Sequence, residues 1–283
     1  MSLLDRLHAA ADSRKRNAAV LSRFFLKERL SIDNMTLEEV ARHCEVSVST
    51  TIRFIRYLGY DTYADFKEDI FDSLRGIEET SQWFKQRSPK GTTVEILKQI
   101  VHSEVSVLER LLAEFDEANY EKFQLLLSEQ DRVFVLGQQS SASMARSFVY
   151  ELGKVRRDVF LIDSMSDVSS HLISYSSERD LTVVFGFPRY PRNILNAVKS
   201  LKRHGCKVVS LTNSKRSPFV DYSDVWLQIY LEYYSFTTGY APIMALLNLI
   251  IIDYCHRNYE KAKDRMREFE LSNKAHKVFV SDL

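Results

Sequence analysis

The sequence predicts a chain of two fold classes: an all-α region over residues 1–77, followed by an α/β domain built on a parallel sheet. Apolar residues recur at helical spacing up to about residue 76, and again from Val94 to about Leu127. Five short apolar runs then start 18 to 26 residues apart, and the gaps between them mostly hold helical segments. Strands that alternate with helices in this way form parallel sheets that are covered on both faces.

The five apolar runs are continuous rather than alternating with polar residues, as expected of buried parallel strands. They are Arg132–Gly137, Asp158–Ile162, Leu181–Gly186, Cys206–Leu211 and Asp224–Ile229. Helical patterns cover Ser141–Lys154 and Pro191–His204, and a long helical stretch is expected from Pro242 to about Leu271. The sequence therefore predicts a five-stranded parallel sheet between helical layers.

A linker is predicted between the two regions, because Ser88, Pro89 and Gly91 are typical of a break in regular structure. We expect a helical domain at residues 1–77, a linker at 78–93, an α/β domain at 94–271 and a C-terminal tail at 272–283. A length of 283 residues, of which 45% are hydrophobic, suits two domains with cores of their own.

Charge and composition exclude several classes of protein. The 39 Lys and Arg balance the 38 Asp and Glu, so net charge indicates no partner, and residues 1–60 are only mildly basic. Cys44, Cys206 and Cys255 lie far apart and form no disulfide framework, which favours a reducing compartment. The N-terminus lacks a signal-peptide pattern, and the apolar run Ile243–Ile252 is too short to span a bilayer. We therefore expect a cytoplasmic protein without membrane contact.

A helix-turn-helix pattern lies at residues 36–58. Thr36 and Glu39 form a capping box that starts the first helix. Ser47 is a good N-cap for the second helix, and Gly59 ends it as a C-cap. The residues expected to face inward are Leu37, Val40, Ala41, Ile52, Ile55 and Leu58. The turn carries Glu45 where many such motifs have glycine.

The outer side of the second helix carries groups that suit DNA. Hydroxyls and helix N-terminal amides bind phosphates, and arginine binds phosphates or guanine edges. The candidate DNA-binding residues are Ser47, Ser49, Thr50, Arg53 and Arg56. We expect this helix to enter the major groove of double-stranded operator DNA. The alternative is a helical hairpin whose polar faces are only solvated.

The second helix and the residues after it carry a family pattern. It consists of Arg53-Phe54, Leu58-Gly59-Tyr60, Tyr63, Phe66 and Lys67. Residues 5–75 closely resemble the N-terminal domain of the RpiR (MurR/RpiR-like) family of phosphosugar-responsive transcription regulators. The second half of that family is a sugar isomerase (SIS) domain, a five-stranded parallel sheet with flanking helices. The resemblance implies a flavodoxin-like three-layer sandwich in the second half of this chain.

Ligands of open parallel sheets bind beyond the carboxyl ends of the strands, so the loops there are the candidates. The first loop, Gly137–Ser141, leads into a helix and offers an anion site, with a simple serine N-cap as the alternative. It resembles the first SIS loop, with Gln139 where a second glycine is usual. The candidate effector-binding residues are Gly137, Gln138, Ser140, Ser141, Ser164, Arg189, Tyr190 and Thr212.

The loop after the third strand departs from the family. SIS domains usually carry a Ser-x-Ser-Gly-x-Thr pattern there, whose hydroxyls bind a sugar phosphate, and in this chain Gly186, Pro188 and Pro191 occupy the hydroxyl positions. Arg189 stands between the two prolines and could replace the hydroxyls as a fixed charge for an anion. The alternatives are that Arg189 pairs with Asp163 and only joins two loops, or that the pocket binds no small molecule.

The attached helix-turn-helix favours a sensor over an enzyme. An isomerase needs a base, for which Glu232 and His171 are nearest by register, and the sequence contains no HExxH, Walker or GxSxG motif. We therefore expect no catalytic residue, metal or cofactor. The alternatives are a SIS-fold phosphosugar isomerase, or a DNA-binding scaffold that answers to a protein through the aromatic stretch Tyr230–Phe236.

The expected function is control of a carbohydrate catabolic operon by a small anionic metabolite, a phosphorylated sugar or sugar acid. Because symmetric regulators bind paired half-sites, we expect a homodimer or homotetramer. The helices predicted at Val94–Leu112 and Pro242–Cys255 are the expected sources of the interface.

Overall fold

The computed structural model describes residues 3–28, 32, 35–73, 88–234 and 237–280. These residues form two compact units that divide between residues 99 and 100, and residues 233–238 cluster with the first unit. Most of the predicted linker, residues 78–87, lies outside the described residues.

Short helices of the first unit pack around one apolar core. They are α1 (Leu3–Ala11), α2 (Arg16–Lys27), α3 (Leu37–His43), α4 (Val48–Tyr57) and α5 (Tyr63–Ser73). Phe25 of α2 lies at the centre, with its ring centroid 4.6 Å from that of Phe66 and 6.2 Å from that of Phe54. The prediction of an all-α N-terminal region is confirmed. Because Phe54 belongs to α4, this core fixes which face of α4 is left outside.

Two helices precede the sheet where the sequence pattern suggested one helical stretch. α7 (Thr93–Ala113) begins after Thr92, whose backbone N–H donates to the Glu95 carboxylate at 2.7 Å. α8 (Glu117–Glu129) begins after Asp116, which accepts a hydrogen bond from the backbone N–H of Asn119. Because Asp116 caps the start of α8, the apolar pattern that began on α7 continues on a second helix.

The second unit is built on a parallel sheet of five strands in the order β2-β1-β3-β4-β5. The strands are β1 (Arg132–Leu136), β2 (Val159–Ile162), β3 (Asp180–Gly186), β4 (Lys207–Thr212) and β5 (Val225–Gln228). Each lies within one or two residues of an apolar run in the sequence, so the predicted fold class is confirmed. A separate antiparallel pair, β6 (Tyr233–Tyr234) and β7 (Thr237–Thr238), follows β5.

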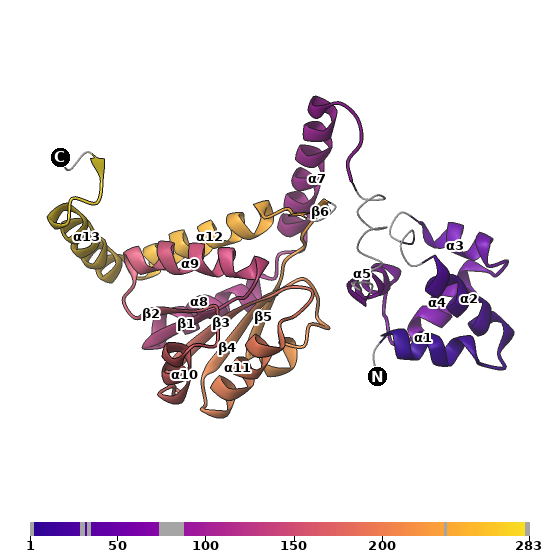
Figure 1. Ribbon diagram of the computed structural model, residues 1–283, viewed down its shortest axis with the longest axis horizontal. Coiled ribbons are helices and arrows are strands. Elements are labelled where there is room, and N and C mark those ends of the chain that lie inside the picture. The colour runs from indigo at the N-terminus through magenta and orange to yellow at the C-terminus, as the bar shows by residue number, and fades with distance from the viewer. Residues whose placement is uncertain (1–2, 29–31, 33–34, 74–87, 235–236, 281–283) are drawn as a thin grey trace. The chain divides into compact units, whose positions relative to one another are not determined.

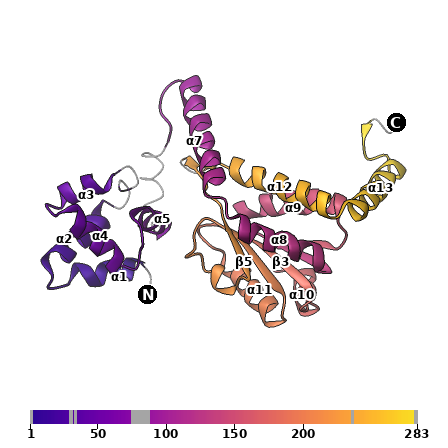
Figure 2. The same cartoon turned by 180° about the vertical axis from the view of Figure 1, so that it is seen from behind.

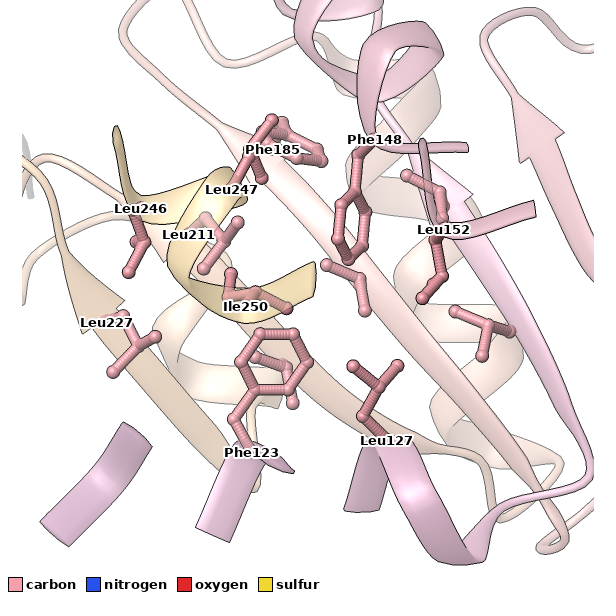
Figure 3. Close-up of a cluster of buried hydrophobic side chains, with 14 of the residues drawn as sticks. Phe123, Leu127, Phe148, Leu152, Phe185, Leu211, Leu227, Leu246, Leu247 and Ile250 are labelled. Carbon is pink, nitrogen blue, oxygen red and sulfur yellow. The ribbon is translucent and has the colours of Figure 1, made fainter. Parts of the chain in front are cut away.

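Helices cover both faces of the sheet and give a three-layer sandwich (Figures 1 and 2). The helices that follow β1 are α9 (Ser140–Val155), α10 (Asp167–Ser174), α11 (Arg192–Arg203), α12 (Ala241–Arg257) and α13 (Tyr259–Ala275). α8, α9 and α12 pack on one face, where Phe123, Phe148 and Ile250 meet strand residues such as Phe185 and Leu211 (Figure 3). α10 and α11 pack on the other face.

The expected helical stretch from Pro242 to about Leu271 is confirmed, and it is divided in two by a break at Asn258. Asn258 has φ −122° and ψ 37°, outside the helical region, and separates α12 from α13. Its side-chain amide donates to the Ser128 hydroxyl at 2.9 Å and to the Tyr254 carbonyl at 3.1 Å. These contacts fix the break, and α13 then continues to Ala275. None of the described helices is long and apolar enough to cross a membrane.

A buried ion pair anchors β1 against β3 at their amino ends. Arg132 donates to both carboxylate oxygens of Asp180, at 2.8 and 2.7 Å, and the backbone N–H of Ser177 donates to the same carboxylate. Burial alone would raise the pKa of Asp180, but these hydrogen bonds and the Arg132 charge outweigh it and lower the pKa. The pair fixes the two strands whose opposite ends form the candidate effector site.

Candidate DNA-binding surface and effector site

The helix-turn-helix begins with the predicted capping box. The backbone N–H of Thr36 donates to the Glu39 carboxylate at 2.7 Å, and the backbone N–H of Glu39 donates to the Thr36 hydroxyl at 3.2 Å. The hydrogen bonds from Thr36 lower the pKa of Glu39. The capping-box prediction is confirmed, and it fixes where α3 starts.

The turn between α3 and α4 keeps the geometry of a glycine turn without a glycine. Glu45 has φ 53°, in the left-handed region, and its backbone N–H donates to the Arg42 carbonyl at 3.2 Å. The backbone N–H of Val46 donates to the Ala41 carbonyl at 3.0 Å, which completes a Schellman motif. For a residue other than glycine, this conformation costs about 1 kcal/mol of strain.

The start of α4 gathers hydroxyl groups beside an arginine. Ser47 caps the helix as predicted, accepting from the backbone N–H of Thr50, and its hydroxyl lies 2.9 Å from that of Ser49 and 2.8 Å from that of Thr50. Arg53 donates to the Thr50 hydroxyl at 3.4 Å. Ser47, Ser49 and Arg53 are exposed and Thr50 is half-buried. The structure therefore brings four of the five predicted DNA-binding residues into one polar cluster.

The remainder of α4 divides into an inner and an outer face. Ile55 and Leu58 are buried as predicted, whereas Ile52 is only half-buried and Phe54 and Thr51 take the inner positions beside them. Arg56, the fifth predicted DNA-binding residue, is exposed one turn beyond Arg53. Tyr57 shares this outer face and is 72% exposed, which sequence reasoning missed because aromatic residues are usually assigned to the core.

The end of α4 also follows the prediction. The helix ends at Tyr57, and Gly59 adopts φ 88°. The backbone N–H of Gly59 donates to the Arg56 carbonyl at 2.8 Å, and that of Tyr60 donates to the Ile55 carbonyl at 3.1 Å. These two bonds form a second Schellman motif, so the expected glycine C-cap is confirmed.

The second candidate site lies where β1 and β3 end. The strand order changes direction between these neighbours, which makes their carboxyl ends the switch point of the sheet. The loops that the sequence singled out, after β1 and after β3, therefore lie side by side. The β1–β3 pairing reaches Leu136, directly before the first loop, and Val184, two residues before β3 ends at Gly186.

The loop after β1 is tightly constrained. Gly137 is buried, and a Cβ atom there would lie 2.5 Å from the Ser141 carbonyl oxygen and 2.9 Å from the Ala145 Cβ, so only glycine lets α9 approach β1 this closely. Gln139 has φ 57° and ψ −127°, a region that favours glycine. Ser140 is exposed, Gln138 is half-buried and Ser141 is 4% exposed at the first turn of α9.

The loop after β3 holds Arg189 in an exposed, left-handed conformation. Its φ is 66°, between Pro188 and Pro191. The Tyr190 hydroxyl donates to the Asn213 side-chain oxygen at 3.1 Å, and the Tyr190 ring packs edge-on against Phe219. Tyr190 therefore anchors the loop after β3 to the loop after β4, and Arg189 projects from an anchored segment.

The other predicted effector-binding residues have different surroundings. Ser164, after β2, is exposed. Thr212 is fully buried at the end of β4, and its hydroxyl donates to the Gly186 carbonyl inside the sheet. Of the two residues considered as isomerase bases, His171 is exposed on α10 and its ring stacks with that of Tyr175, and Glu232 is half-buried after β5.

Further cations lie at the carboxyl edge of the sheet beyond those predicted. Arg146 of α9 forms an ion pair with Asp163, the residue directly after β2, so the partner suggested for Arg189 is taken by another arginine. Lys215 and Arg216 lie in the loop after β4. The sequence offered no local signal for Arg146, because it occupies an ordinary exposed position in the middle of a helix. No group of His, Cys, Asp and Glu suited to hold a metal occurs within the described ranges.

Comparisons with known proteins agree with this architecture. The SIS domain family model matches residues 126–253. An HTH-type transcriptional regulator of Providencia stuartii is 24% identical over 89% of this chain and 88% of its own length. An HTH-type transcriptional regulator of Clostridium perfringens is 21% identical over 94% of this chain and 96% of its own length.

Solved structures show the same fold. NanR of Vibrio vulnificus, complexed with ManNAc-6P, covers 96% of this chain and 98% of its own with a TM-score of 0.61 at 20% identity. The sugar isomerase domain of an RpiR transcription factor from Sphaerobacter thermophilus covers 61% of this chain and 96% of its own with a TM-score of 0.58 at 20% identity. The C-terminal half of this chain is therefore a SIS domain. Over most of its length the chain is similar to proteins named HTH-type transcriptional regulators.

Proposed function

We propose that α4 binds operator DNA and that a phosphorylated sugar or sugar acid, bound at the carboxyl ends of β1 and β3, controls this binding. The operator would belong to a carbohydrate catabolic operon. The outer face of α4 supports the first part, because it combines a capped N-terminus, three hydroxyls and two arginines with no acidic residue.

The observation that carries the effector proposal is the placement of Arg189 at the switch point. An exposed arginine is held there by two prolines and an anchored tyrosine, beside the start of α9. A guanidinium binds phosphate or carboxylate through two parallel hydrogen bonds, and the first amides of α9 suit the same charge. Positive charge is also added at this edge by Arg146, Lys215 and Arg216, and it is partly offset by Asp163, which pairs with Arg146.

The proposed effector contacts are the Gly137–Ser141 loop, Ser164, Arg189 and Tyr190, while Thr212 shapes the site from within the sheet. A structural neighbour supports the ligand class, because NanR of Vibrio vulnificus is complexed with ManNAc-6P. We propose sensing rather than isomerisation, since a helix-turn-helix precedes the SIS domain in the same chain.

The experiment is a thermal-shift screen of the full chain against phosphorylated sugars, phosphorylated sugar acids and their unphosphorylated forms. A ligand at 100 times its dissociation constant adds about 2.7 kcal/mol of stability, which is readily measured. Each ligand that binds is then assayed for turnover and for its effect on the affinity for an operator selected from random DNA. Turnover of a sugar phosphate without any DNA binding would favour the isomerase; binding of DNA with no responsive ligand would favour the scaffold.

A further inference from the structure

One face of the helix α7 is apolar and mostly exposed. With 21 residues α7 is the longest helix in the described part of the chain, and ten of these are Val, Leu or Ile, yet none of its residues is buried. Another side of the helix is partly covered, because the Arg110 guanidinium lies 3.3 Å from the centroid of the Tyr230 ring and the Glu104 carboxylate lies against Gly239. Apolar surface of this extent marks an interaction site.

The exposed apolar residues of α7 follow an eleven-residue repeat. Val94, Leu97 and Val101 recur as Val105, Leu108 and Leu112, each eleven positions later. Five of the six are between 45% and 82% exposed, and Leu108 is half-buried. An eleven-residue repeat closely matches the turn of an α-helix, so it keeps one stripe on one face of a nearly straight helix. Such a stripe is typical of helices that pair with each other.

Two charges flank the stripe on the same side. Lys98 and Glu109 are both exposed, and neither forms an ion pair with another described residue. They also lie eleven residues apart, about 16 Å along the helix, so they cannot reach each other within one chain. Each of these charges would face an opposite charge if a second α7 lay alongside in the opposite direction.

We infer that α7 pairs antiparallel with α7 of a second copy of this chain. About a two-fold axis near residue 103, Val94 faces Leu112 and Val101 faces Val105 of the second copy. In the same register Lys98 faces the second copy's Glu109, and the symmetry forms this ion pair twice. A second copy of this chain fits this surface, because an antiparallel α7 presents the same apolar stripe to the first one and places an opposite charge beside each of its two charges. This inference goes beyond the proposed function and does not depend on the effector.

The stripe is tested by analytical ultracentrifugation of the full chain. Val101→Glu places two like charges at the centre of the antiparallel pair, and we expect it to raise the dimer dissociation constant at least 100-fold. The matched control is Ser106→Glu, which adds the same charge on the exposed opposite face and should leave the dissociation constant within about twofold. Equal dissociation constants for the parent and Val101→Glu, or a parent that is a monomer at micromolar concentration, would overturn the inference.

The direction of pairing is tested by exchanging the two charges. Lys98→Glu and Glu109→Lys alone should each raise the dimer dissociation constant about tenfold, because each brings two pairs of like charges together. The double variant should return to within about threefold of the parent. Because the two residues cannot meet within one helix, this rescue can come only from a second copy in antiparallel register. A double variant that is as weak as, or weaker than, the singles would overturn antiparallel pairing.

Discussion

Two glycines of α9 and its entry loop should respond in opposite ways to the same substitution. A Cβ at Gly137 would lie 2.5 Å from the Ser141 carbonyl oxygen, whereas ordinary contacts begin at 3.4 Å, so α9 must move by about 1 Å. Overpacking of this kind costs about 1–3 kcal/mol. At about 2–4 °C per kcal/mol for a domain of this size, Gly137→Ala should lower Tm by about 2–12 °C.

Gly153 provides the matched control within the same helix. A Cβ there meets nothing within 4 Å, and its backbone is helical. Alanine stabilises a helix by up to about 1 kcal/mol more than glycine does, so Gly153→Ala should raise Tm by about 1–4 °C. Differential scanning calorimetry of the full chain measures both variants.

The Gly137→Ala and Gly153→Ala variants also test whether the packing of α9 affects effector binding. Displacement of α9 moves its first amides away from the site, so Gly137→Ala should weaken effector binding about tenfold or more, while Gly153→Ala leaves it unchanged. A Gly137→Ala variant as stable as the parent would show that α9 does not approach β1 as closely as the structure indicates.

Three further outcomes are expected. Arg53→Ala and Arg56→Ala should each weaken operator binding at least tenfold and reduce its salt dependence, measured by fluorescence anisotropy over a salt series; folded variants that bind like the parent would remove α4 as the reader. Glu45→Gly should relieve the left-handed strain and raise the free energy of unfolding by about 0.5–1 kcal/mol in denaturant titrations, and a loss of stability would contradict this. The pKa of Asp180 is lower in the folded chain than in the unfolded chain, where it is about 3.9. Asp180 therefore contributes its full share of the free energy of unfolding above about pH 3.9, and this contribution is lost as the pH falls further. The Tm difference between parent and Asp180→Asn should therefore be large at pH 7 and shrink below about pH 4, and a difference independent of pH would contradict it.

Much of the fold could be predicted because its signals are local in the sequence. The buried strands appear as continuous apolar runs, and the capping box at Thr36 and the glycine at Gly59 mark helix ends by residue type alone. The break at Asn258 was missed because it depends on a hydrogen bond to Ser128, 130 residues earlier. No local pattern announces such a contact.

The candidate sites were predictable in position but not in detail. The positions of the loops at the switch point follow from the strand order. The left-handed conformations of Gln139 and Arg189 could not be predicted, because glutamine and arginine usually avoid them. The pairing of Arg146 with Asp163 joins a mid-helix residue to a distant loop, so only the structure brings the two together.

The most direct test of the account is the effect of Arg189→Ala on the response of operator binding to the effector. Fluorescence anisotropy of the labelled operator is measured with and without the effector for the parent, for Arg189→Ala and for Arg203→Ala, an exposed arginine at the far end of α11. Arg189→Ala should bind the operator with the parent's affinity when the effector is absent, and the effector should then change that affinity less than about twofold. Arg203→Ala should respond as the parent does, by about tenfold or more. A folded Arg189→Ala variant that keeps the parent's full response would contradict the claim that this loop holds the effector.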